Sequence, residues 1–293
     1  MKKWVLILFI FLFLGSCSVD EENVVGPYFD SIYFGLESNN VWMTDSEIIE
    51  SGFVEEHASV PDLIVLTQDV DDYTNGDLMT YFVDASSGIE EIGIKSSSDL
   101  GISWSKKKNA DISGIEDMRP VDPSIVQLED GSLRLYFYDF KNNLNQDLSN
   151  IYSAKSDDGI NFELEQKVFS YNHVTDPEVV YFNGKWFMYL ANNGSVLLAV
   201  SEDGLNFETY QDVVIDCSIP GAFVDNGVYL YCNNYAGVNE FFSSDGYNFV
   251  LNNVIIRSTM GEIIGDSGPV VLINGNKAMI LKVVNLNNPI VSK

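Results

Sequence analysis

The sequence predicts an all-β protein, a five-bladed β-propeller in which amino-terminal strands complete the last blade and close the ring. Three observations predict this fold. One unit recurs along the chain, tight turns separate apolar runs inside each copy, and the two chain ends hold complementary parts of a unit. A β-sandwich would not explain why the chain ends complement each other.

The clearest copy of the unit covers residues 173–207. It opens with Asp176-Pro177-Glu178, and two apolar runs then flank Asn183-Gly184. Asn-Gly between apolar runs is the strongest short hairpin signal, because a type I′ turn requires positive φ at both central residues. A third run ends in Ser201-Glu202-Asp203-Gly204, and Asn206-Phe207 opens a fourth. This copy predicts a four-stranded antiparallel meander.

Three further copies start at Ser59, Arg119 and Ser218, and a truncated one starts at Asp266. The truncated copy supplies only two strands before the chain ends, and residues 32–42 match the missing second half. Pairing of the two ends would close the ring, which leaves few strand edges exposed.

A recurring turn sequence follows the third strand of the units. The copy from Ser97 to Trp104 resembles the Asp-box of sialidases. Related sequences of the form Ser-x-Asp-Gly-x-Asn-Phe begin at Ser156, Ser201 and Ser243. We expect their carboxylates to hold the turns, as Asx motifs do, rather than to catalyse. A true sialidase would need an arginine triad. The chain has only Arg119, Arg134 and Arg257, and Arg134 falls within a predicted strand.

The amino terminus resembles that of a bacterial lipoprotein. Lys2-Lys3 and the apolar run of residues 4–14 predict a signal peptide over residues 1–16, and Leu14-Gly15-Ser16-Cys17 resembles a lipobox. The resemblance implies cleavage before Cys17 and lipidation of that residue. We then expect an acidic tether over residues 17–30 and, from the repeats, a single propeller domain over residues 31–293. The resemblance places the protein, as a monomer, on the outer membrane or cell surface of a Gram-negative bacterium. An ordinary signal peptide with an incidental cysteine is the alternative.

The charge excludes one class of partner. With 43 acidic and 16 basic residues, the formal net charge is −27, which repels nucleic acid and other polyanions. Neutral ligands are therefore expected, although such a surface also serves solubility in salty surroundings.

Two further cysteines, Cys217 and Cys232, flank a predicted hairpin that turns at Asn226-Gly227. The expected register puts them too far apart for a disulfide, so two unpaired thiols are predicted.

Acidic residues recur where the innermost strands begin. Asp62, Asp122, Asp176, Glu178 and Asp266 all fall on the face opposite the tight turns, at the mouth of the predicted channel. Loops and convergent acids at such a mouth indicate a binding site. Period-two alternation predicts that residues before and after the strand proline share one pocket.

Val121-Asp122-Pro123 and Thr175-Asp176-Pro177 resemble the strand starts of the five-bladed glycoside hydrolase superfamily, which includes families 43, 32 and 68. The resemblance covers nearly the whole mature chain and implies three catalytic carboxylates on the first three blades. Asp62 would be the base or nucleophile, Asp122 the group that tunes and orients, and Asp176 or Glu178 the proton donor. The family pattern has Glu where Asp176 stands.

One position precedes each of these strands. It holds His57, Arg119 and His173 in the first three copies. These residues, with Asp266, are candidates for sugar binding or pKa modulation; repeat similarity with solvent-facing side chains is the alternative.

No zinc spacing is present, and no cofactor is expected. A structural calcium ion in the channel is the one alternative left open.

Two functions follow from these observations. The first is an exported glycoside hydrolase that cleaves neutral oligosaccharides or polysaccharides with a carboxylate pair or triad. The second is a non-catalytic surface propeller that binds a glycan or a protein. A bare scaffold is the remaining possibility.

Overall fold

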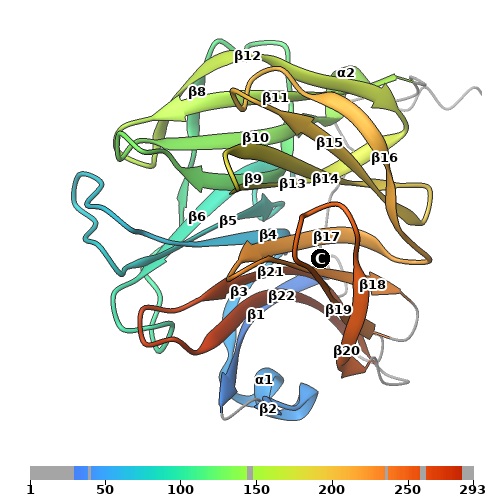
Figure 1. Cartoon of the computed structure of the whole chain (residues 1–293). Helices are drawn as coiled ribbons and strands as arrows, with labels where there is room; N and C mark the ends of the chain where they lie inside the picture. The colour runs from blue at the N-terminus through green and yellow to red at the C-terminus, as the bar shows by residue number, and fades with distance from the viewer. Residues whose placement is uncertain (1–29, 39–40, 144–147, 235–236, 258–261, 286–293) are drawn as a thin grey trace, which may run out of the picture.

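The computed structural model describes residues 30–38, 41–143, 148–234, 237–257 and 262–285. Five sheets are arranged around a common axis (Figure 1), which confirms the predicted propeller. Blade 1 contains β4 (Ala58–Val65), β5 (Leu78–Asp84), β6 (Glu91–Ser97) and β7 (Lys108–Asn109). Blade 2 contains β9 (Pro120–Gln127), β10 (Leu133–Asp139), β11 (Leu148–Ser156), β12 (Asn161–Asn172) and β8 (Asp111–Ser113).

Blades 3 and 4 are regular four-stranded meanders. Blade 3 contains β13 (Val174–Phe182), β14 (Lys185–Asn192), β15 (Ser195–Ser201) and β16 (Glu208–Ile215). Blade 4 contains β17 (Ser218–Val224), β18 (Val228–Asn234), β19 (Gly237–Ser243) and β20 (Val250–Arg257). The first strand of each blade lies nearest the channel.

The two chain ends close the ring in blade 5, as predicted. Strands β21 (Glu262–Val271) and β22 (Lys277–Asn285) come from the carboxyl end, and β1 (Asp30–Ser38), β2 (Val41–Trp42) and β3 (Phe53–Glu56) from the amino end. β1 pairs antiparallel with β22 from Asp30↔Val284 to Leu36↔Ala278. Because one sheet contains both ends, separating them would break a complete ladder of backbone hydrogen bonds.

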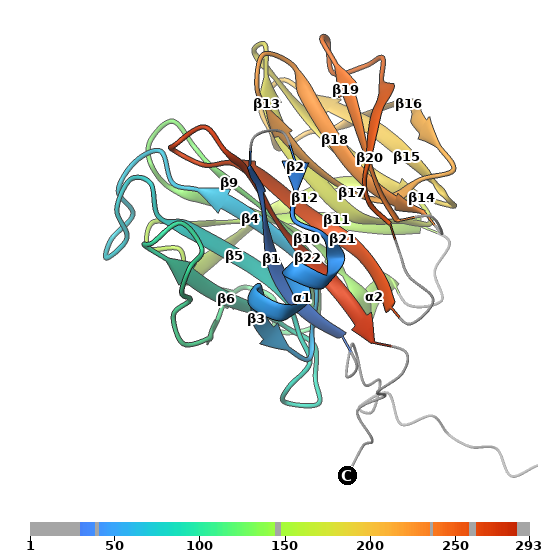
Figure 2. The ribbon, with the colours of Figure 1, turned by 90° about the horizontal axis from the view of Figure 1, so that it is seen from below.

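The sequence did not predict the two short helices, α1 (Asp45–Ser51) and α2 (Phe140–Asn143). Thr44 caps α1 in a capping box with Glu47, and the helix lies beside β1 at the edge of blade 5 (Figure 2). Its Ile48 side chain packs over Gly35, where an added Cβ would come within 3.0 Å of it. None of the described helices is long and apolar enough to span a bilayer. The predicted signal peptide, the predicted lipidation site Cys17 and the predicted tether up to residue 29 lie outside the described residues.

The Asp-boxes hold turns, as expected. In blade 3, Asp203 Oδ1 accepts hydrogen bonds from the backbone N–H groups of Leu205 and Asn206, both at 2.8 Å, and from the Ser201 hydroxyl. Blades 2 and 4 repeat this pattern around Asp158 and Asp245. These carboxylates are therefore fully used within their own turns.

A buried tyrosine joins each of three blades to the next. The hydroxyl of Tyr81 donates to the carbonyl of Gly159 at 2.7 Å, across the boundary between blades 1 and 2. Tyr136 and Tyr189 make the equivalent bonds to Gly204 and Gly246, both at 2.9 Å. Each acceptor is the glycine of the next blade's Asp-box, so the turns also set the spacing between blades.

The prediction of two unpaired thiols was wrong, because Cys217 and Cys232 form a disulfide with a Cα–Cα distance of 5.6 Å. The predicted register assumed continuous pairing along the hairpin. Instead, Val224 rather than the expected Asp225 pairs with Val228, and a β-bulge in β17 shifts the register again between Ser218 and Gly221, so that Ser218 pairs with Asn233. This shift draws Cys217, just before the strand, towards Cys232.

Candidate functional site

The same β-bulge interrupts the inner strand of every blade. In each strand two consecutive residues drop out of the pairing register, and the first of them has a positive φ. These first residues are Val60, Asp122, Asp176, Ile219 and Asp266, with φ between 43° and 54°. Aspartate tolerates this left-handed conformation, whereas a β-branched residue is strained in it. The bulge thus gives Asp122, Asp176 and Asp266 equivalent places around the channel.

The bulge also separates the predicted catalytic residues into two layers. Alternation would have put the residues before and after the proline on one face, but an extra residue breaks the period of two. Asp122 lines a cavity at the mouth, with Asp176 beside it, while Asp62 and Glu178 line a different pocket nearer the tight turns. The structural equivalent of Asp122 in blade 1 is Val60, not Asp62.

The mouth cavity has a volume of about 240 Å³ and lies between blades 1, 2 and 3. Asp122, Glu90, Ser59 and Thr175 contribute polar groups to its wall, together with Tyr138. Its apolar wall consists of Val60, Val83, Val121 and Phe140. This volume is below the usual range of about 300–1,000 Å³ for drug-sized ligands, so it suits a single small ring.

Asp122 and Asp176 interact directly. The backbone N–H of Asp176 donates to the Asp122 carboxylate, and burial together with the charge of Asp176 raises the pKa of Asp122 well above its ordinary value. Burial also raises the pKa of Asp176 to about 6, although the Thr175 hydroxyl donates to its Oδ2 at 2.5 Å and favours the charged form. Two close carboxyls cannot both ionise easily, so the pair holds a proton near neutral pH.

Blade 5 contributes a largely buried lysine, Lys282, near the mouth. Lys282 pairs with Asp266, which is only 3% exposed. Burial alone would lower the pKa of Lys282, but the negative charges of Asp266, Asp30 and Asp176 outweigh burial and raise it. In the pairing register, Lys282 stands opposite Gly265, just as Tyr138 stands opposite Val121 in blade 2. Asp266 therefore lies at the same level of the channel as Asp122 and Asp176, and it is ion-paired.

Asp62 and Glu178 link inner strands below the mouth. Asp62 Oδ2 accepts from Ile125 N–H and Oδ1 from Leu63 N–H, both at 2.7 Å, while Glu178 Oε1 accepts from Ala222 N–H at 3.1 Å. In blade 2 the Ser124 hydroxyl occupies the equivalent position and accepts from Val179 N–H at 3.0 Å. Burial raises the pKa of Asp62 to about 7 and that of Glu178 well above its ordinary range, with the charge of Asp62 adding to the latter.

The three predicted sugar-binding residues that precede the inner strands occupy equivalent places in blades 1 to 3. His57, Arg119 and His173 each immediately precede the inner strand of their blade, as the repeat predicted. His57 and His173 have left-handed φ values of 55° and 56°, and His173 is exposed. Arg119 is close enough to Glu90 to oppose the rise in its pKa that burial causes.

Sequence reasoning missed Glu90, Thr175, Tyr138 and Lys282. Glu90 lies in the loop before β6, and its Oε2 is buried without a hydrogen-bond partner among the described residues. Lys282 could have been noticed as the one basic residue in an otherwise apolar predicted strand. Within the described part of the chain, no group of three or more His, Cys, Asp or Glu residues is arranged to hold a metal ion.

Searches found no matching family profile and no matching curated protein. Solved structures with the same fold do match. A family 117 glycoside hydrolase from the marine bacterium Zobellia galactanivorans is 15% identical, with a TM-score of 0.58 over 89% of this chain and 93% of that one. A thermostable family 43 glycoside hydrolase is also 15% identical, with a TM-score of 0.52 over 70% of this chain and 78% of its own.

An N-acetylgalactosamine deacetylase from F. plautii, solved with blood group B trisaccharide, is 13% identical, with a TM-score of 0.59 over 83% of this chain and 81% of its own. One fold thus carries different reactions in these proteins, and identities this low establish the fold alone. The chain has the five-bladed propeller fold of the family 43 and family 117 glycoside hydrolases.

Proposed function

We propose that this protein binds a neutral oligosaccharide at the channel mouth and hydrolyses its terminal glycosidic bond with Asp122 and Asp176. One observation carries the proposal: the shared bulge puts two interacting carboxyls beside a cavity of about 240 Å³. The net charge of −27 disfavours an anionic substrate. Similarity to glycoside hydrolases supports the reaction type.

The chemistry requires one protonated and one ionised carboxyl. The Asp122–Asp176 pair supplies both near neutral pH, because burial and mutual repulsion retain one proton on the pair. The protonated member donates to the leaving oxygen, and the ionised member activates water or stabilises the developing positive charge. Glu90, with its unpaired Oε2, offers a hydrogen-bond acceptor to a sugar hydroxyl in the same cavity.

A second function is favoured by Val60. It occupies the position in blade 1 at which a third carboxylate would stand beside Asp122 and Asp176. A mouth with two acids and an apolar third position also suits a protein that holds a sugar without cleaving it. Binding without turnover is therefore the alternative.

Turnover separates the two functions. The purified chain would be incubated with arabino-, xylo-, galacto- and fructo-oligosaccharides, and released sugar and binding would both be measured. Hydrolysis that Asp122→Asn abolishes and Asp157→Asn retains supports the proposal, since Asp157 is an exposed carboxylate on the Asp-box turn of blade 2. Saturable binding without released sugar supports the alternative, and neither binding nor release removes both.

Export and lipid anchoring at Cys17 are the cellular part of the proposal, supported by the lipobox-like Leu14-Gly15-Ser16-Cys17. A location at the outer membrane or cell surface is proposed on the same ground. The test is fractionation of cells that produce the full chain. The native chain is expected in the membrane fraction, and Cys17→Ser is expected to release it; equal retention of both would contradict lipidation.

A further inference from the structure

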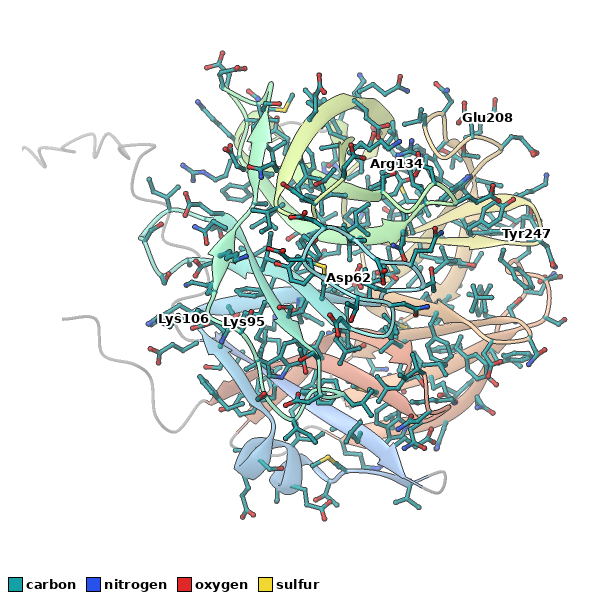
Figure 3. All side chains as sticks on the ribbon, turned by 90° about the vertical axis from the view of Figure 1, so that its left-hand side faces the viewer. Asp62, Lys95, Lys106, Arg134, Glu208 and Tyr247 are labelled. Atoms are coloured by element: carbon teal, nitrogen blue, oxygen red, sulfur yellow. A yellow bond between two sulfur atoms is a disulfide. The ribbon has the colours of Figure 1, made fainter. Side chains whose placement is uncertain are left out.

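A second pocket lies at the other end of the channel from the proposed active site. Its volume is about 480 Å³, within the usual range of about 300–1,000 Å³ for small-molecule sites. All five inner strands contribute to it, and its walls are mostly apolar, including Leu63, Val126, Val179, Phe223 and Val270. Figure 3 looks towards the face with the tight turns, and Asp62 lies near the centre of the ring.

The rim of this pocket is apolar and open to solvent. Tyr181 is 48% exposed, Val224 39% and Ile273 67%, and each lines the pocket. Exposed apolar side chains gathered around an opening mark an interaction site more often than scattered ones do. Burial of these rim groups against an apolar ligand would contribute binding free energy.

The floor carries two carboxyls without a balancing cation. Asp62 and Glu178 are each 5% exposed, and both line the pocket. No lysine or arginine in the described part of the chain forms an ion pair with either carboxyl. By contrast, the buried Asp266 pairs with Lys282 and the buried Glu240 pairs with Lys277. The buried Asp84 likewise pairs with Lys107, so the floor lacks the cation that these three buried acids have.

We propose that this pocket binds a small organic cation, with its apolar body between the inner strands and its ammonium group against Glu178 Oε2 and Asp62. Burial of the two carboxyls close together raises both pKa values, and a cation between them would favour their ionised forms. The net charge of −27 raises the local concentration of cations. A neutral sugar fits poorly, because the mostly apolar walls offer few partners for its hydroxyls.

The test uses the full chain and three matched probes: n-hexylammonium, 1-hexanol and ammonium. Calorimetry is expected to show one site for hexylammonium, at least tenfold tighter than for either other probe, because only hexylammonium has both the chain and the charge. Glu178→Gln keeps an oxygen for Ala222 N–H and is expected to weaken hexylammonium binding at least tenfold. Asp157→Asn removes the same charge from an exposed turn and is expected to change binding less than twofold.

A second measurement locates the site in the unmutated protein. Nuclear Overhauser contacts are expected between bound hexylammonium and the methyl groups of Val126 and Val224, both of which line the pocket. Equal affinity for hexanol and hexylammonium would overturn the role of the charge, and contacts to other methyl groups alone would overturn the site. No binding at millimolar concentration would overturn the proposal whether or not the Glu178 variant folds.

Discussion

Asp62 Oδ2 accepts a 2.7 Å hydrogen bond from the backbone N–H of Ile125, which joins the inner strand of blade 1 to that of blade 2. Glu178 makes the equivalent link from blade 3 to blade 4, and Ser124 the one between them. In blades 4 and 5 the equivalent residues are Gly221 and Gly268. There the inner strands approach directly, since a Cβ on Gly221 would lie 1.7 Å from the carbonyl oxygen of Ser267. These links hold the channel at the level that divides the two pockets.

The first prediction concerns the pH dependence of stability. The pKa of Asp62 is about 7 in the folded chain against an ordinary value of 3.8, so the folded state retains a proton that the unfolded state loses. Stability from this group is therefore fully present below pH 4 and falls as pH rises towards 7, with a slope of up to about 1.4 kcal/mol per pH unit.

Urea unfolding of the native chain and Asp62→Asn at pH values from 4 to 8 tests this. The difference in unfolding free energy between the two proteins is expected to shift in favour of the variant as pH rises through this window. The amide oxygen retains one of the two backbone hydrogen bonds, so the variant is expected to fold. A difference that is constant, or that shifts towards the native chain, would contradict the raised pKa.

The disulfide is expected to stabilise blade 4. It closes a loop with a sequence separation of 15 residues, and a cross-link of that length contributes about 3 kcal/mol in the chain-entropy treatment. Cys217→Ser with Cys232→Ser should lower the unfolding free energy by about 2–4 kcal/mol. A reductant should lower the melting temperature of the native chain and leave the double variant unchanged. An equal effect of the reductant on both proteins would argue against the bond.

The Asp-box of blade 2 offers a matched pair of acids. Asp158 accepts hydrogen bonds from the backbone of Ile160 and Asn161, and these bonds help to hold its pKa at about 2. Its exposed neighbour, Asp157, serves as the control. Asp158→Ala is expected to cost about 0.5–1.5 kcal/mol, measured by urea unfolding at pH 7, since the turn loses hydrogen bonds that water replaces only in part. Similar costs for Asp157→Ala would show that the turn hydrogen bonds contribute little.

The Lys282–Asp266 pair gives a double-mutant test. Lys282→Met leaves the Asp266 carboxylate buried without its cation and is expected to destabilise the fold by about 3–5 kcal/mol. Lys282→Met with Asp266→Leu removes both charges and is expected to recover most of that loss, since an apolar pair of similar volume is often neutral. Additive losses in the double variant, measured by thermal and urea unfolding, would contradict direct pairing.

The fold could be predicted from the sequence because repeats, Asn-Gly turns and complementary ends all pointed to one ring. The bulge could not be predicted from the sequence. Its five first residues include Val60 and Ile219, whose side chains disfavour positive φ, so no local propensity marks the position. Tertiary pairing between strands forces that conformation. The unexpected disulfide follows from the same bulge together with a hairpin turn one residue longer than predicted, because Val224 rather than Asp225 pairs with Val228.

The sequence predicted which acids lie at the channel, but it did not predict how they are arranged there. The sequence placed the strand-start acids at the channel, but the layer to which each belongs depends on the bulge. Asp122, Asp176 and Asp266 occur at bulge positions, and Asp62 and Glu178 do not. Glu90 and Lys282 come from outside the inner strands, and only the closed ring brings them to the mouth.

Non-additivity at the mouth tests the hydrolase proposal most directly. Single-turnover rates on the best oligosaccharide substrate would be compared for the native chain, Asp122→Asn, Asp176→Asn and the double variant. If the two carboxyls act as one unit, each single variant loses about 10²–10⁴-fold in rate, and the double variant loses little more than the worse single one. Independent multiplicative losses, or full activity in either single variant, would contradict catalysis by this pair.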